Sequence, residues 1–151
     1  MLDALMKVGI SSDHGGFEMK EAIKKHFGDI DWVDYGCHST ESVDYPEFAQ
    51  KLCKAVLNKK IEKGITLCGT GIGASLAANR FHGIRAALCH DEFTAEMCRK
   101  HNDANVLVMG GRVVAEPLAL KMVKIFFSTE FEGGRHQRRV EAIENSEVGT
   151  P

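Results

Sequence analysis

The stretch Gly64-Ile65-Thr66-Leu67-Cys68-Gly69-Thr70-Gly71-Ile72-Gly73-Ala74 decides the fold. Its first five residues are mostly apolar or β-branched, which is typical of a strand that is buried on both faces. The glycine-rich residues 69–73 predict a loop, and the small side chains that follow predict a helix from Ala74 to Arg80. A strand, a loop and a helix in this order form the repeating unit of parallel α/β sheets.

The same unit recurs on both sides of this stretch. Four more short strands alternate with segments whose apolar residues recur at helical spacing. We expect these strands at Lys7–Ser11, Trp32–Asp34, Ile84–Cys89 and Asn105–Met109. Of the helices between them, we expect one to end near Phe27, one to begin after Pro46 and one to span Asp91 to Lys100. Such alternation predicts parallel strands joined by right-handed crossovers, with helices on both faces. The predicted fold class is α/β, a Rossmann-like three-layer sandwich with a five-stranded parallel sheet and a C-terminal helix.

The C-terminal third of the chain carries two more predicted helices. The segment Leu118–Phe127 is apolar almost all round, so we expect a partner subunit to cover it. A polar helix from Arg135 to about Glu144 follows Gly133-Gly134, and residues 146–151 are expected to form a flexible tail. We expect residues 1–151 to form a single domain.

Composition restricts the class of protein. The 151 residues are 44% hydrophobic and 26% charged, which suits one globular domain with a core. A net charge of −2 gives no overall basic field, so we expect neither a nucleic-acid nor a membrane partner. The five cysteines are odd in number and include no CxxC pair, and the chain starts with no secretory hydrophobic segment, so we expect a reducing cytoplasm.

Ligands of open parallel sheets bind beyond the carboxyl ends of the strands. Three predicted strands run there into polar or glycine-rich loops, which are Asp13–Gly16, Cys68–Gly73 and Gly110–Arg112. We expect these loops to converge on one crevice.

The loop after Cys68 favours an anion, because successive backbone N–H groups can point into the concavity at a helix N-terminus. A thiol beside such a loop can ionise near neutral pH, which makes Cys68 a candidate nucleophile or base. Glycines also serve simple tight turns, and a buried cysteine often only packs. The packing interpretation suits Cys53, Cys89 and Cys98.

A dinucleotide site is the alternative interpretation of this loop. Residues 69–74 fit the pattern GxGxxA after a strand, and Asp91 follows near the distance of a ribose-binding acid. The motif lies on the third strand instead of the first, and this interpretation leaves Cys68 and His101 without a role.

Histidine and arginine residues supply further candidates. His101 lies where a predicted helix gives way to a strand, and it suits either a general acid or base or a simple helix-end residue. Arg135 and Arg139 share one helical face and suit a phosphate or a solvated basic stripe, and Arg112 is a third candidate. The other histidines at 26, 38, 82, 90 and 136 are assigned to surface or packing roles, and since no two histidines have HxH or HxxxH spacing, no metal site is predicted.

Six short motifs in this order resemble the ribose-5-phosphate isomerase B family. They are Asp13–Phe17, Asp44-Tyr45-Pro46, Cys68–Gly73, Arg80 through Arg85, His101–Asn105 and Glu132–Gln137. The resemblance implies a cofactor-free aldose–ketose isomerase of the pentose phosphate pathway, which interconverts D-ribose 5-phosphate and D-ribulose 5-phosphate. It also implies a homodimer, in some members a tetramer, with active sites between subunits.

The resemblance assigns roles by position. It makes Cys68 the base, Thr70 and His101 the pair that opens the sugar ring, and the loop Gly69, Gly71, Ile72 and Gly73 the anion hole. The remaining assignments are phosphate binding by His14, Arg112, Arg135 and Arg139, and contacts with sugar hydroxyls by Asp13, Tyr45 and Asn102. Arg138 departs from the pattern of related sequences, which often have an uncharged residue there.

Two alternatives to the pentose activity stay open. A closely related chemistry is the isomerisation of a 6-phosphate aldohexose, such as allose or galactose 6-phosphate. A different class of function is a non-catalytic module that binds a sugar phosphate or a dinucleotide.

Overall fold

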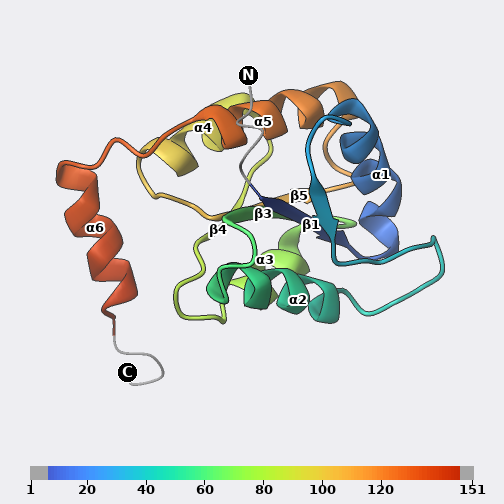
Figure 1. Ribbon diagram of the computed structural model, residues 1–151, viewed down its shortest axis with the longest axis horizontal. Helices are drawn as coiled ribbons and strands as arrows, with labels where there is room; N and C mark the ends of the chain where they lie inside the picture. The colour runs from blue at the N-terminus through green and yellow to red at the C-terminus, as the bar shows by residue number, and fades with distance from the viewer. Residues whose placement is uncertain (1–6, 147–151) are drawn as a thin grey trace.

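A computed structural model describes residues 7–146 and contains a five-stranded sheet (Figure 1). The strands are β1 (Val8–Ser12), β2 (Trp32–Asp34), β3 (Lys63–Cys68), β4 (Ala86–Leu88) and β5 (Val106–Gly110). Their order is β2-β1-β3-β5-β4, and every pairing is parallel. All strand carboxyl ends therefore lie along one edge, which confirms the predicted α/β class.

Helices cover both faces of the sheet (Figure 1). One layer contains α1 (Phe17–His26), α4 (Glu92–Lys100) and α5 (Glu116–Ser128), and the other contains α2 (Tyr45–Leu57) and α3 (Ile72–Ala78). The last helix, α6 (Arg135–Glu144), projects away from both layers at the left of the view. No helix among residues 7–146 is long and apolar enough to cross a membrane. The predicted tail lies almost wholly outside the described residues.

The apolar helix α5 packs within its own chain. Its side chains Met122, Val123 and Phe126 are fully buried in the core between the sheet, α1 and α4. The apolar residues on its flanks, Leu118 and Ile125, are half-buried. Contrary to the expectation from the sequence, the apolar pattern of α5 does not require a covering subunit, because the chain itself buries most of these side chains.

Helix α3 begins two residues earlier than the sequence predicts. Gly71 precedes its first residue and has a φ of +83°, a left-handed conformation that favours glycine. A Cβ on Gly71 would lie 2.9 Å from the carbonyl carbon of Met109. The tight turn after β3 therefore requires glycine at position 71, because of the left-handed backbone there and because a Cβ would clash with Met109.

Candidate functional site

The three loops predicted at the carboxyl ends of the strands meet in the structure. Gly111 N–H donates to the carbonyl oxygen of Cys68 at 2.9 Å, and Arg112 N–H donates to that of Gly69 at 3.0 Å. A Cβ on Gly15 would lie only 2.9 Å from the Gly69 nitrogen. These backbone contacts hold residues from β1, β3 and β5 in one rigid arrangement.

Cys68 is the last residue of β3 and is buried, with 4% of its surface exposed. The Gly71 N–H donates to its Sγ at 3.1 Å. The loop therefore wraps around the sulfur and directs a backbone N–H at it. Such a donor stabilises negative charge on the sulfur.

Thr70 and Gly73 shape the remainder of this loop. The Thr70 Oγ1 accepts a hydrogen bond from Ile72 N–H at 3.2 Å. Gly73 lies against the ring of Tyr45, so that a Cβ there would be 2.5 Å from the Tyr45 Cζ. Tyr45 starts helix α2, and this close approach brings that helix to the edge of the loop.

Asp13 and His14 follow β1 on the other side of Cys68. The Asp13 Oδ1 accepts hydrogen bonds from Gly15 N–H at 2.8 Å and Gly16 N–H at 3.2 Å, which fixes the turn. The His14 Nδ1 accepts from Val43 N–H at 3.1 Å, so its proton lies on Nε2. Next to them is a hollow of about 280 Å³, lined by His14, Gly15, Glu18, Met19, Thr40, Gly111 and Arg112.

We call these residues the thiol-loop group, comprising Asp13, His14, Tyr45, Cys68–Gly73 and Arg112. Its members lie near one another within one chain. The other predicted site residues, His101, Asn102, Arg135 and Arg139, form a second set, which we call the helix-end group.

His101 directly follows helix α4 as its C-cap and contacts two residues near the start of α6. Its Nε2 lies 3.4 Å from the Oε1 of Glu132, and its ring stacks on that of His136 with centroids 4.2 Å apart. The His136 Nε2 lies 3.8 Å from the same carboxylate oxygen. Burial lowers the pKa of His136, and the charges of His101 and Arg135 lower it further.

Glu132 and His136 are the residues that the sequence analysis missed at this position. His136 was assigned to a surface or packing role, yet it is 8% exposed and lies against His101. Spacing along the chain gives no sign of this contact, because 35 residues separate the two histidines. Only the position of the motif Glu132–Gln137 beside α4 brings them together.

The two groups lie at opposite edges of the sheet. Strands β3 and β5 run in register from Gly64 opposite Val106 to Cys68 opposite Gly110. His101 comes before β5 and Cys68 ends β3, so roughly the length of a strand separates them, about 13–17 Å for five residues. One chain therefore does not bring Thr70 and His101 together.

The arginines of the helix-end group are exposed on α6. Arg135 and Arg139 are both exposed, and the helix α6 that carries them projects away from both helix layers, on the opposite side of the view from α1 (Figure 1). The four residues predicted to bind phosphate thus divide into two pairs within one chain, His14 with Arg112 and Arg135 with Arg139.

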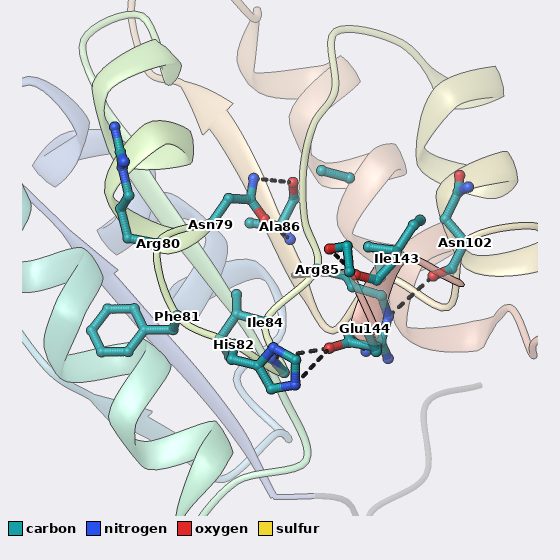
Figure 2. Close-up of a pocket in the computed structure, with 14 residues that line it drawn as sticks. Asn79, Arg80, Phe81, His82, Ile84, Arg85, Ala86, Asn102, Ile143 and Glu144 are labelled. Atoms are coloured by element: carbon teal, nitrogen blue, oxygen red, sulfur yellow. Dashed lines mark hydrogen bonds and ion pairs between the residues drawn. The ribbon is translucent and has the colours of Figure 1, made fainter. Parts of the chain in front are cut away.

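A larger hollow, of about 580 Å³, lies between residues 79–87 and the end of α6 (Figure 2). Glu144 reaches across it and accepts a hydrogen bond from Gly83 N–H at 3.1 Å, and it forms an ion pair with Arg85. Asn102 is the only predicted site residue in its lining. We place the candidate site at the thiol loop instead, because a thiol, backbone donors and the Arg112 guanidinium converge there.

A buried ion pair lies at the end of β2, the strand that pairs with β1. The Lys20 Nζ is fully buried and lies 2.6 Å from the Asp34 Oδ2, and the Lys24 Nζ lies 2.8 Å from the same oxygen. Burial acts to raise the pKa of Asp34, but hydrogen bonds from Lys20, Lys24 and the Gly36 N–H outweigh it and the pKa is lowered. The pKa of Lys24 is raised by its hydrogen bond to Asp34.

Comparison with known proteins identifies the family. The model of the Ribose/Galactose Isomerase family matches residues 8–143, which is nearly the whole chain. This chain belongs to that family. The match includes both the thiol-loop group and the helix-end group.

Three known proteins are similar to this chain over nearly its whole length and nearly their own. Ribose-5-phosphate isomerase B of Escherichia coli is 43% identical over 141 residues, which are 92% of this chain and 95% of that protein. Two solved structures are similar to this chain in both fold and sequence. The ribose-5-phosphate isomerase B of Clostridium thermocellum has a TM-score of 0.90 at 48% identity, covering 92% of this chain and 95% of that one. That of Thermotoga maritima has a TM-score of 0.92 at 46% identity, covering 94% and 99%.

Proposed function

We propose that this protein is an aldose–ketose isomerase that interconverts D-ribose 5-phosphate and D-ribulose 5-phosphate without a cofactor. The observation that carries the proposal is the Cys68 thiol at the end of β3, enclosed by a loop whose Gly71 N–H points at the sulfur. Family membership and the similarity to ribose-5-phosphate isomerases B support it.

Cys68 acts as the base in this proposal. As a thiolate it takes the proton from C2 of the open-chain aldose, which gives an enediolate with its negative charge on O1. The hydroxyl proton of O2 then moves to O1, and the Cys68 thiol returns its proton to C1 to give the ketose. The enediolate oxygen needs hydrogen-bond donors as its charge develops. The residues Gly69, Gly71, Ile72 and Gly73 surround the thiol, and the first turn of α3 offers backbone N–H groups without intrahelical partners.

The substrate phosphate binds between these two pairs of residues. His14 and Arg112 line the hollow beside the thiol loop, and the exposed Arg135 and Arg139 complete the site. Remote binding energy from this anion fixes the reacting carbons next to Cys68. Asp13, Tyr45 and Asn102 contact the sugar hydroxyls, and His101 opens the furanose ring together with Thr70.

This assignment of roles requires two copies of the chain. Cys68 and His101 lie at opposite edges of one sheet, and a second subunit is the simplest source of a histidine and two arginines for the thiol loop. We therefore propose a homodimer with two shared active sites. The protruding α6 supports this, because a helix that extends away from its own core is placed to reach another subunit (Figure 1).

A second candidate substrate is a 6-phosphate aldohexose. The family description names galactose as well as ribose, and the same thiol chemistry serves both. A dinucleotide site has weaker support, because the glycine loop follows the third strand in the chain and its Gly73 lies against the Tyr45 ring. We propose that the enzyme works in the cytoplasm, which agrees with five cysteines that are all buried and unpaired within residues 7–146.

A coupled assay with EDTA present tests the function. Purified protein should convert ribose 5-phosphate to ribulose 5-phosphate with a higher kcat/KM than it shows with allose 6-phosphate. Mixing with NADH should leave the nucleotide fluorescence unchanged. Turnover of allose 6-phosphate but not of ribose 5-phosphate would show that the hexose phosphate is the substrate. Turnover of neither sugar phosphate would refute the proposed function.

A further inference from the structure

His101, Glu132 and His136 place three ligand atoms of the kind that bind transition metals close together. One atom from each residue lies within 4.8 Å of the other two. Imidazole nitrogen and carboxylate oxygen are common ligands in catalytic zinc sites, and two histidines with one glutamate suffice for such a site. No other such set of three residues occurs in the part of the chain that the structure describes.

The spacing is close to what a metal ion needs. Bonds of about 2.0–2.2 Å in tetrahedral geometry put two ligand atoms about 3.3–3.6 Å apart. The His101 Nε2 and Glu132 Oε1 are already at 3.4 Å, and the His136 Nε2 and Glu132 Oε1 are at 3.8 Å. The stacked imidazoles must tilt toward one another to share an ion, because a metal ion lies close to the plane of each imidazole that binds it and these two planes are nearly parallel, at 12°.

The burial of the three side chains allows this tilt. The side chain of His136 is 10% exposed and serves as a fixed anchor, whereas those of His101 and Glu132 are 40% and 52% exposed and can rotate. The exposed side leaves a coordination position open to water. Arg135 and Arg139 raise the local positive potential, and the Glu132 carboxylate offsets it.

We propose that His101, Glu132 and His136 bind a divalent transition-metal ion such as Zn²⁺, and that the bound ion inhibits the isomerase by occupying the His101 imidazole. Nitrogen ligands favour zinc, copper or nickel over Mg²⁺ and Ca²⁺, which require mostly oxygen ligands. The binding site stands on geometry alone, whereas the inhibition rests on the role of His101 in the proposed function.

Metal binding is measured directly, apart from activity. Co²⁺ is titrated into the Cys68→Ala variant, so that the thiol cannot take the ion, and its visible absorption is followed. We expect one bound ion per chain. His136→Gln and Glu132→Gln should each weaken binding by more than about 100-fold, since even an outer-shell partner is worth roughly 10- to 100-fold. His26→Gln, at an exposed histidine on α1, is the matched control and should bind normally.

Inhibition by ZnCl₂ is then measured with the enzyme that retains Cys68. Zinc should inhibit ribose 5-phosphate turnover, EDTA should restore it, and Glu132→Gln should resist inhibition. Glu132 is exposed, so this variant folds even if His136→Gln does not. Co²⁺ binding that neither substitution weakens, or no binding, would overturn the site. Binding as expected without inhibition would instead leave the site intact and refute the ring-opening role of His101.

Discussion

The thiol-loop group and the helix-end group are held in place by different means. In the first, backbone hydrogen bonds join three loops, and Gly15, Gly71 and Gly73 sit where a Cβ would clash with a neighbouring atom. In the second, side chains on the ends of α4 and α6 meet across segments that are far apart in the chain. A Cβ on Gly133 or Gly134, just before α6, would meet nothing within 4 Å.

This difference suggests a division of labour. The rigid group suits the chemical step, in which sub-ångström placement of the base matters. The more open group suits ring opening and capture of the phosphate, steps in which an exposed side chain can adjust to the substrate.

The largest effect is expected at the centre of the thiol-loop group. Cys68→Ala should fold normally and lose about 10² to 10⁴ in kcat, which is the usual contribution of a positioned general base. Circular dichroism controls for folding, and Cys53→Ala, on the buried face of α2, is a matched control for removal of a buried thiol. Turnover near that of the unmodified enzyme would refute the role of Cys68.

Asp34→Asn should lower the free energy of unfolding by breaking the buried ion pair at the end of β2. It leaves the fully buried Lys20 ammonium without its carboxylate, which should cost about 3 kcal/mol in the free energy of unfolding. Because the pKa of Asp34 is lower in the folded state, its contribution is present above the unfolded pKa of about 3.9 and is lost as the pH falls through the folded pKa.

Denaturant titrations at several pH values check this prediction. The difference in unfolding free energy between the unmodified protein and Asp34→Asn should be largest near neutral pH and should shrink in acid below about pH 4. A difference that stays constant down to low pH would mean that the carboxylate charge contributes nothing.

Arg135→Ala tests the capture role of the helix-end group. Loss of one charge-assisted contact with phosphate is worth roughly 1.5 to 3 kcal/mol, so KM should rise by about 10- to 100-fold while kcat changes little. Arg138→Ala is the control for general positive charge, because Arg138 lies on the same helix, about 60° around it from Arg135, and is not a predicted phosphate ligand. Equal changes in KM for both variants would show that α6 contributes only general positive charge.

Alanine substitutions at two glycines compare the two groups directly. Gly71 has a φ of +83° and Gly133 a φ of +68°, so either substitution should cost roughly 1–2 kcal/mol for the left-handed backbone alone. Gly71→Ala adds a clash with Met109 and Gly110 and should cost more stability and most of the activity. Equal losses of stability in thermal unfolding would contradict the claim that the thiol loop is the more tightly packed region.

The sequence predicted the thiol-loop group better than the helix-end group, for a physical reason. A residue that directly follows a buried strand must lie at the carboxyl edge of the sheet, so periodicity alone brings Asp13, Cys68 and Arg112 together. No periodicity relates His101 to Glu132 and His136, because their contact depends on the path of an irregular segment past α4. The packing of α5 could not be predicted either, since an apolar helix pattern does not reveal which of its faces the same chain covers.

Subunit mixing tests most directly the central claim that the two groups join across a subunit interface. Cys68→Ala and His101→Asn chains are dissociated, mixed in equal amounts and reassembled, and ribose 5-phosphate turnover is measured. With shared sites, half of the dimers are mixed and each holds one site with both residues intact, so the mixture should recover about a quarter of the unmodified activity. If Cys68 and His101 serve one site within a single chain, every site stays defective, and an activity no greater than the mean of the two variants would contradict the account.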